Sequence, residues 1–185
     1  MRVIGIAGWS GSGKTTLIEC MIPVWCAQGL RVATIKHAHH GFDLDTPGKD
    51  SWRHREAGAS KVLMLSDARW VLMSELRGAP EPPFAEQLRL LAPCDLVIVE
   101  GFKRAPIPKV EVYRPEVGKP PIWPEEPMIR AVATPGGEQA RSALPEECPL
   151  PLLDLDHPEA VAEAALELAY SAEQWEEEEI EDNHE

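Results

Sequence analysis

The residues best equipped for chemistry lie near the start of the chain, where residues 8–16 read Gly-Trp-Ser-Gly-Ser-Gly-Lys-Thr-Thr. This spacing matches the pattern G-x-x-x-x-G-K-[ST] of the phosphate-binding P-loop. Glycines let successive backbone N–H groups turn towards a phosphate, and the positive end of a following helix adds to the attraction. We therefore predict a nucleoside triphosphate site with contacts from Gly8, Ser10, Gly11, Ser12, Gly13, Lys14, Thr15 and Thr16.

Two side chains of this segment have specific predicted roles. Lys14 can reach the β- and γ-phosphates, which makes it a catalytic candidate, and the Thr15 hydroxyl can hold Mg²⁺. The flanking pattern supports the motif, because residues 2–7 form an apolar run typical of a buried strand and residues 15–28 have the apolar spacing of a helix. Pro23 lies inside that helix, so we expect a kink or a break there.

A second buried strand is predicted at residues 95–101, Asp-Leu-Val-Ile-Val-Glu-Gly. Such a continuous apolar run is typical of a strand covered on both faces, in the centre of a parallel sheet. Glu100 ends this strand on the P-loop side, where an acid can hold an Mg²⁺-bound water or orient the attacking water. Asp95 is about 16 Å away at the other end of the strand, so we assign the catalytic and metal roles to Glu100.

The segment after a predicted strand at residues 31–36 is rich in His, Gly, Pro and Asp, and is expected to be a loop on the ligand side of the sheet. His37 and His39 are predicted to make polar contacts with phosphate or with a partner's cofactor. A Zn²⁺ or Ni²⁺ site is the alternative interpretation of these histidines. Against that alternative, His39 and His40 are adjacent and would point apart in an extended loop.

The acids of the same loop are further candidates. One of them is expected to close on the nucleotide and to orient Mg²⁺ or the attacking water, although any of them could instead be a surface turn residue. We rank Asp45 first, as a catalytic residue, and Asp43 second, as a metal ligand. The predicted catalytic set is therefore Lys14, Asp45 and Glu100, and the predicted metal set is Thr15, Glu100 and Asp43.

The rest of the chain predicts an α/β protein with a mostly parallel central sheet and a β-hairpin or extended arm. Helices are expected at 49–57, 84–91 and 158–170, a hairpin at 61–66 with 69–74, strands at 107–114, 129–134 and 152–155, and an irregular proline-rich segment at 115–127. We expect residues 1–170 to form one nucleotide-binding domain and residues 171–185 to form a disordered or frayed acidic tail.

Composition narrows the function classes. The net charge is −13, but eight acids and no Lys or Arg lie in residues 173–185, so the remainder carries only −5. No basic patch suggests nucleic-acid binding, and no apolar run approaches the ~20 residues of a membrane span. The four cysteines have no C-x-x-C spacing, and the first residues read as a strand rather than a secretion signal. We therefore expect a cytoplasmic protein that binds neither nucleic acid nor membrane.

Taken together, four segments resemble the molybdopterin-guanine dinucleotide biosynthesis adaptor (MobB) family. They are the P-loop, the run Ile-Lys-His-Ala-His-His at 35–40 with Asp-Leu-Asp at 43–45, the run Pro-Gly-Lys-Asp-Ser at 47–51 with Ala-Gly-Ala at 57–59, and Val-Glu-Gly-Phe-Lys at 99–103. The P-loop alone fits many families, whereas the His-rich loop with its downstream Pro-Gly-Lys-Asp is far more specific. The resemblance extends to about residue 170 and excludes the acidic tail.

This resemblance implies a P-loop NTPase-type three-layer sandwich, a homodimer, and GTP binding with Mg²⁺ and slow hydrolysis. It also implies a role in molybdenum cofactor maturation, in which the family assists a nucleotidyltransferase (MobA) that joins GMP to molybdopterin. Other cofactor-assembly proteins, and molybdopterin itself, are further expected partners. We expect the homodimer contact in residues 107–127, whose strand and proline-rich arm are too extended for a minimal domain.

The sequence departs from the usual pattern at the base end of the nucleotide. Guanine recognition commonly uses an Asn-Lys-x-Asp motif, but the only Asn is Asn183, and Pro135 stands where a base-reading residue is expected. The preference for GTP over ATP therefore rests on resemblance. Two alternative functions stay open: a small-molecule kinase with Arg53 and Arg55 in a lid, and a Ni²⁺ or Zn²⁺ metallochaperone GTPase that uses the histidines.

Overall fold

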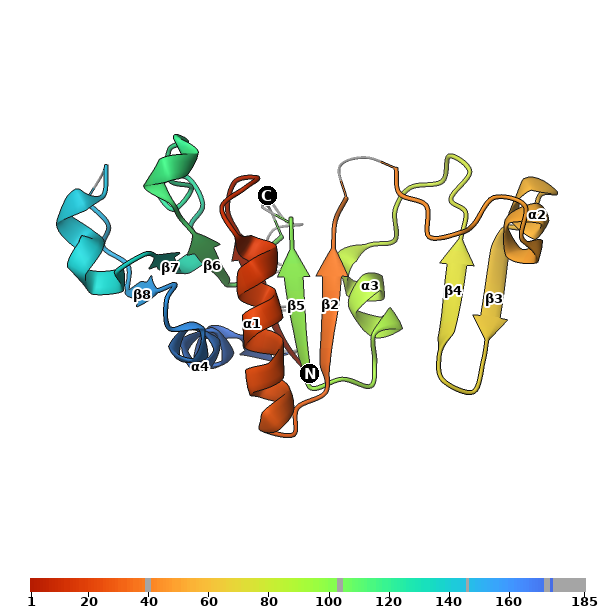
Figure 1. The fold of residues 1–185 in the computed structure, drawn as a ribbon, viewed down its shortest axis with the longest axis horizontal. Coiled ribbons are helices and arrows are strands. Elements are labelled where there is room, and N and C mark those ends of the chain that lie inside the picture. Colours follow the sequence, from red (N-terminus) through yellow and green to blue (C-terminus); the bar gives the residue numbers. More distant parts are fainter. Residues whose placement is uncertain (39–40, 103–104, 146, 172–173, 175–185) are drawn as a thin grey trace. The chain divides into compact units, whose positions relative to one another are not determined.

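The computed structural model describes residues 1–38, 41–102, 105–145, 147–171 and 174. The chain forms two compact units, one of residues 1–37 and 84–185 and the other of Ala38–Pro83. The smaller unit therefore lies within the range that the sequence assigned to a single nucleotide-binding domain. Figure 1 labels the elements of both units.

The larger unit is built on a seven-stranded sheet with the strand order β2-β5-β1-β6-β7-β8, in which β9 also pairs with β1. All pairs are parallel except β1 with β9. Its elements are β1 (Arg2–Ala7), α1 (Lys14–Ala27), β2 (Val32–Lys36), α3 (Phe84–Leu90), β5 (Leu96–Glu100), β6 (Lys109–Val112), the 3-10 helix η1 (Pro115–Val117), β7 (Ile129–Thr134), the 3-10 helix η2 (Gly137–Ala143), β8 (Leu152–Asp154), α4 (Pro158–Leu168) and β9 (Tyr170–Ser171).

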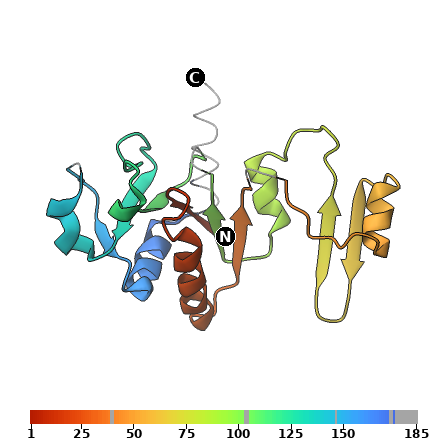
Figure 2. The ribbon, with the colours of Figure 1, turned by 45° about the horizontal axis from the view of Figure 1, so that its top comes forward.

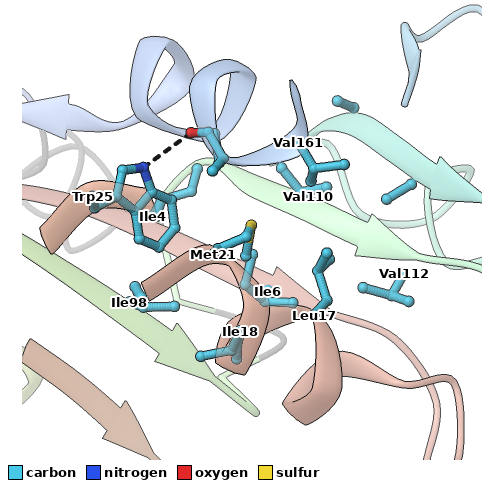
Figure 3. Close-up of a cluster of buried hydrophobic side chains, with 14 of the residues drawn as sticks. Ile4, Ile6, Leu17, Ile18, Met21, Trp25, Ile98, Val110, Val112 and Val161 are labelled. Carbon is cyan, nitrogen blue, oxygen red and sulfur yellow. Dashed lines mark hydrogen bonds between the residues drawn. The ribbon is translucent and has the colours of Figure 1, made fainter. Parts of the chain in front are cut away.

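Apolar side chains cover both faces of this sheet, which produces the three expected layers. On one face, Ile4 and Ile98 pack with Trp25 of α1 and Val161 of α4, and Figures 1 and 2 show these helices side by side. Figure 3 shows this cluster, in which the buried Trp25 Nε1 donates to Ala162 O at 3.1 Å. That hydrogen bond satisfies an indole N–H that has no access to water.

The opposite face is covered by α3 and by irregular chain. Val3, Val97 and Val99 pack against the fully buried Leu88 of α3. Farther along the sheet, Trp123 of the proline-rich segment packs with Val132 of β7. Because successive strand residues point to opposite faces, the continuous apolar runs of β1 and β5 fit a sheet buried on both sides.

Several details differ from the expectations. α1 runs unbroken from Lys14 to Ala27 with Pro23 inside it, so there is no break; packing of its apolar face on the sheet outweighs the lost backbone bond. The last helix ends at Leu168, and Tyr170 instead opens β9. This short antiparallel strand has too few residues for a visible period-two pattern.

The expected dimer contact at 107–127 is wrong for its strand. β6 lies between β1 and β7, and all four of its residues are buried within the sheet. The proline-rich arm is tied to the same strand, because the Glu111 carboxylate accepts hydrogen bonds from the backbone N–H groups of Ile122 and Trp123 at 2.9 Å each. The strand is therefore excluded as a dimer contact, whereas the exposed part of the arm, including residues 118–120, is not tested as one.

The smaller unit contains α2 (Asp50–Glu56) and the predicted hairpin, β3 (Lys61–Leu65) with β4 (Trp70–Ser74), as a separate two-stranded sheet. Leu63 pairs with Leu72 and Leu65 with Trp70, so these four side chains share one face of the hairpin. All four are exposed, at 53%, 44%, 70% and 66% respectively. The other face carries Val62, which is buried and packs towards α2.

Candidate functional site

The P-loop lies where the motif predicts, between the carboxyl end of β1 and the start of α1. Gly8, Gly11 and Gly13 have φ values of +142°, +82° and +94°, which L-amino acids with side chains rarely adopt. A Cβ at Gly8 would lie 2.6 Å from Val112 O and 2.7 Å from Ser12 Oγ. Glycine at this position thus allows the loop to lie directly against the end of β6.

Lys14 is the first residue of α1, and its ammonium group lies at the P-loop. Its Nζ donates to Gly8 O and to Trp9 O, at 2.9 Å each. These bonds hold a positive charge beside the inward-turned backbone of the loop. Such a charge complements a polyphosphate.

Thr15 and Glu100 are brought together as predicted, although 85 residues separate them in sequence. Thr15 Oγ1 donates to Glu100 Oε1 at 3.1 Å, and Lys36 Nζ lies 3.5 Å from Glu100 Oε2. The Glu100 side chain is 14% exposed, and that of Lys36 is 62% exposed. A hydroxyl and a carboxylate are hard oxygen donors of the kind that Mg²⁺ prefers, so this pair fits the predicted metal. The parallel pairing of β2, β5 and β1 creates the cluster.

Asp95 occupies the other end of the same strand, as expected, and has a different partner. Arg31 binds it through two side-chain bonds of 2.9 Å, and Arg31 N donates to the same carboxylate at 2.8 Å. These bonds lower the pKa of Asp95. Asp95 therefore has a structural partner at the end of β5 that is far from the P-loop.

Arg114 is a residue of the site that the sequence analysis missed. It follows β6, and its Nε donates to Ser12 O at 3.0 Å, so the neighbouring strand holds the carbonyl of the loop from outside. Trp9 is held in the same way, since its Nε1 donates to Pro120 O at 2.7 Å. Only the pairing of β1 with β6 brings residues 114 and 120 to the loop, so no local signal could have identified them.

The other predicted loop residues differ in exposure. Ser10, Gly11, Thr15 and Thr16 are exposed. Ser12 is 2% exposed, and its buried Oγ has no hydrogen-bond partner within the described part of the chain. Because a buried hydroxyl without a partner costs free energy, a ligand oxygen within reach would be stabilising there.

His37 continues the end of β2, where its N donates to Glu100 O at 3.0 Å. Its ring packs edge-on against Phe102, with centroids 5.0 Å apart. Contact of His37 with phosphate stays a prediction. His39 and His40 lie outside the described residues. Across the described ranges, no group of three or more His, Cys, Asp and Glu side chains is arranged to hold a metal ion.

Asp43 and Asp45 belong to the smaller unit, where both bind Arg55. Asp45 Oδ2 accepts from Arg55 Nε at 3.0 Å, and Asp45 Oδ1 accepts from Ser51 Oγ at 2.7 Å. Asp43 accepts from Arg55 at 3.1 Å, and Glu75 binds the same guanidinium at 2.9 Å. The bonds from Ser51, and then from Arg55, keep the pKa of Asp45 below its ordinary value. The predicted nucleotide-sensing role of these acids stays untested, but their contacts order the loop before α2.

The same contacts bear on the kinase alternative. Three carboxylates surround the Arg55 guanidinium, whose side chain is 15% exposed. An arginine held in this way supports its own unit. Nothing in its surroundings favours the lid role considered from the sequence.

An opening of about 510 Å³ lies within the smaller unit, between α2 and the hairpin. Its lining is apolar on the strand side, through Val62, Met64, Val71 and Met73, and polar on the helix side, through Asp50, Ser51 and His54. All of its lining residues belong to the smaller unit, whereas the P-loop belongs to the larger one. None of the helices in the described part of the chain is long and apolar enough to cross a membrane.

Comparison with known proteins gives concordant matches. The family model for "Molybdopterin guanine dinucleotide synthesis protein B" (MobB) matches residues 3–135. The chain is 48% identical over 138 residues to the molybdopterin-guanine dinucleotide biosynthesis adapter protein of Haemophilus influenzae, covering 71% of this chain and 74% of the relative. It is 38% identical over 174 residues to the protein of that name from Escherichia coli, covering 89% and 91%.

Solved structures agree on the fold. A crystal structure of a molybdopterin-guanine biosynthesis protein B has a TM-score of 0.66 at 28% identity, covering 90% of this chain and 99% of the other. The crystal structure of Bacillus subtilis MobB has a TM-score of 0.69 at 24% identity, covering 92% and 99%. The arrangement of strands and helices is therefore shared along almost the whole length of these chains.

Proposed function

The chain belongs to the MobB family, and on that premise we propose that it binds GTP with Mg²⁺ and hydrolyses it slowly while acting as an adapter in molybdopterin guanine dinucleotide biosynthesis. The adapter role follows from the curated relatives, which carry that name over most of their length. The nucleotide part rests on one observation above the others. Thr15 Oγ1 lies 3.1 Å from Glu100 Oε1 beside a P-loop with positive-φ glycines.

Each group has a role in this proposal. Backbone N–H groups of the P-loop and the Lys14 ammonium bind the phosphates. Thr15 and Glu100 would hold Mg²⁺, which supplies charge stabilisation at the β- and γ-phosphates. Glu100 orients the attacking water, and Arg114 keeps the Ser12 carbonyl turned away from the phosphates. Hydrolysis is slow in this scheme because it assigns no arginine to stabilise the charge that develops on the transferred phosphoryl group.

The partners that we propose belong to the same scheme. We place the homodimer contact on the hairpin face formed by Leu63, Leu65, Trp70 and Leu72, because it is an exposed apolar sheet face. A second copy offers an equivalent face, as a two-fold interface requires. The nucleotidyltransferase MobA and other cofactor-assembly proteins remain the proposed partners of the dimer, with molybdopterin as a further ligand.

Nucleotide binding is tested by thermal shift and calorimetry with GTP, GDP and ATP, each with and without Mg²⁺. We expect guanine nucleotides with Mg²⁺ to raise the melting temperature most, because ligands that bind only the folded state stabilise it. Lys14→Ala should lower GTP affinity by at least about a hundredfold, as expected when a charged hydrogen-bonding group is lost. It should change the melting temperature without nucleotide by only a few degrees, because only the two loop hydrogen bonds of Lys14 are lost.

The matched control is Lys61→Ala, which removes an exposed lysine from the hairpin. It should bind GTP as the wild type does. Equal GTP affinity of the Lys14→Ala variant and the wild type would refute the site. Stronger stabilisation by ATP than by GTP would refute the base assignment alone.

A further inference from the structure

The P-loop and Glu100 together orient a nucleotide across the sheet. Glu100 ends β5, on one side of β1, and it marks the metal and the γ-phosphate end. The nucleoside end must then extend the other way, over the carboxyl ends of β6, β7 and β8. Three strand spacings separate β1 from β8, which is about 14 Å. A nucleoside triphosphate spans this distance from its phosphates to the far edge of its base.

The segment that follows β7 packs closely against the end of β8. Gly137 has a φ of +50°, and a Cβ there would lie 3.0 Å from both the N and the Cβ of Asp154. Leu155 N also donates to Thr134 O at 3.2 Å. These contacts fix Asp154, the last residue of β8, beside the segment where a base-reading residue was expected and Pro135 stands.

The two carboxylate oxygens of Asp154 differ in their hydrogen bonds. Oδ1 accepts from Gly136 N at 3.1 Å and from Asp156 N at 3.0 Å. Oδ2 has no hydrogen bond or ion pair with any residue that the structure describes. The nearby Glu138 differs, because Arg141 and Leu152 N bind its carboxylate. Asp154 is therefore the half-buried acid at this end of the sheet with an oxygen available to a ligand.

We propose that Asp154 determines base specificity, with Oδ2 accepting hydrogen bonds from N1–H and the exocyclic amine of guanine. This assignment rests on the proposed GTP function and supplies the recognition that the missing Asn-Lys-x-Asp motif would provide. Adenine presents an acceptor at N1, so a carboxylate disfavours it. A site built around such an acceptor discriminates against the wrong base, because that base leaves a half-buried polar group unpaired.

The test is Asp154→Asn, measured by calorimetry with GTP and xanthosine triphosphate. Asparagine keeps Oδ1 for Gly136 and Asp156 but presents an amide N–H₂ in place of Oδ2. That N–H₂ donor would face the amine donor of guanine, which is unfavourable. It could instead donate a hydrogen bond to the C2 carbonyl of xanthine, which is favourable. We expect the ratio of GTP to xanthosine triphosphate affinity to fall at least tenfold. Asp156→Asn, which changes an exposed acid two residues on, is the control and should leave the ratio unchanged.

A second measurement needs no variant. Inosine triphosphate lacks the exocyclic amine, so the wild type should bind it at least tenfold more weakly than GTP. Suppose that the wild type binds GTP tightly. If the ratio of GTP to xanthosine triphosphate affinity in Asp154→Asn then stays within twofold of the wild-type ratio, or if the wild type binds inosine triphosphate as well as GTP, the role of Asp154 is overturned while the GTP function stands. If the wild type binds no guanine nucleotide, the proposed function is refuted, and the role assigned to Asp154 is refuted as well.

Discussion

At the scale of single residues, Glu100 is the side chain whose surroundings define the chemistry most narrowly. Its Oε1 accepts a hydrogen bond from the Thr15 hydroxyl, and its Oε2 lies near the Lys36 ammonium group. A carboxylate between a P-loop hydroxyl and a cation can hold a metal-bound water or orient the attacking one. Asp95, at the opposite end of the strand, accepts hydrogen bonds from Arg31 on both of its carboxylate oxygens.

Glu100→Gln separates binding from hydrolysis. We expect the rate of phosphate release to fall by about a hundredfold, in the range that a positioned acid or base contributes. Nucleotide affinity measured without Mg²⁺ should stay within a few-fold, because Lys14 and the loop backbone are intact. Single-turnover release of phosphate measures the effect. Glu86→Gln on α3 is an exposed control, and an unchanged hydrolysis rate in Glu100→Gln would rule out the role.

At the scale of elements, the smaller unit is organised by Arg55 of α2. Its guanidinium joins the loop acids Asp43 and Asp45 to Glu75, which follows β4. Arg77 closes the same region by donating to Arg55 O at 2.9 Å. The hairpin alone buries little, since a two-stranded sheet is marginal in water, so this network and α2 supply much of the order.

Asp45→Asn tests that network through pH. Because the pKa of Asp45 is lowered in the folded protein, its carboxylate stabilises the fold above the unfolded pKa of about 3.9. This stabilisation is lost as the pH falls through the folded pKa. The variant should melt below the wild type near neutral pH, and the gap should close under more acidic conditions.

Thermal unfolding followed by circular dichroism across that pH range measures the gap. Asp67→Asn, in the exposed hairpin turn, is the control and should follow the wild type throughout. Identical melting of Asp45→Asn and the wild type at neutral pH would mean that the network carries no stability.

At the scale of the whole molecule, the exposed face of the hairpin is the surface on which we propose the homodimer contact. Leu65 and Trp70 are cross-strand partners at 70% and 66% exposure, and Leu63 and Leu72 extend the same face. Such a contiguous apolar face is unusual on a monomer, and the two hairpin edges also lack neighbours within their own sheet. By contrast, the strand first expected at the interface is buried between β1 and β7.

Leu65→Glu combined with Trp70→Glu should convert a dimer to a monomer, because each subunit would bring two buried charges to the interface. Light scattering coupled to size exclusion measures the mass. Leu90→Glu changes a residue of similar exposure, 64%, on α3 in the larger unit, and should leave the dimer intact. A monomeric wild type at micromolar concentration, or a dimeric double variant, would contradict the placement.

The sequence by itself determined the position of the P-loop between a strand and a helix, and most of the elements. The P-loop, the strand that ends in Glu100 and the hairpin were all predictable, because each depends on a local pattern: a motif, a continuous apolar run or an alternation with a turn. Pro23 does not break α1, although local preference allows a break there, since packing of α1 on the sheet outweighs the lost backbone bond.

Only the tertiary structure decided which distant residues meet. Parallel pairing brings Arg114 to Ser12 across 102 positions, and the loop after β7 lies close against Asp154, the residue that we propose reads the base. It also gave Asp45 partners in Ser51 and Arg55. Contacts of this kind depend on strand order and register, which residue type and spacing do not encode locally, so the candidate base-reading residue could be proposed only from the fold.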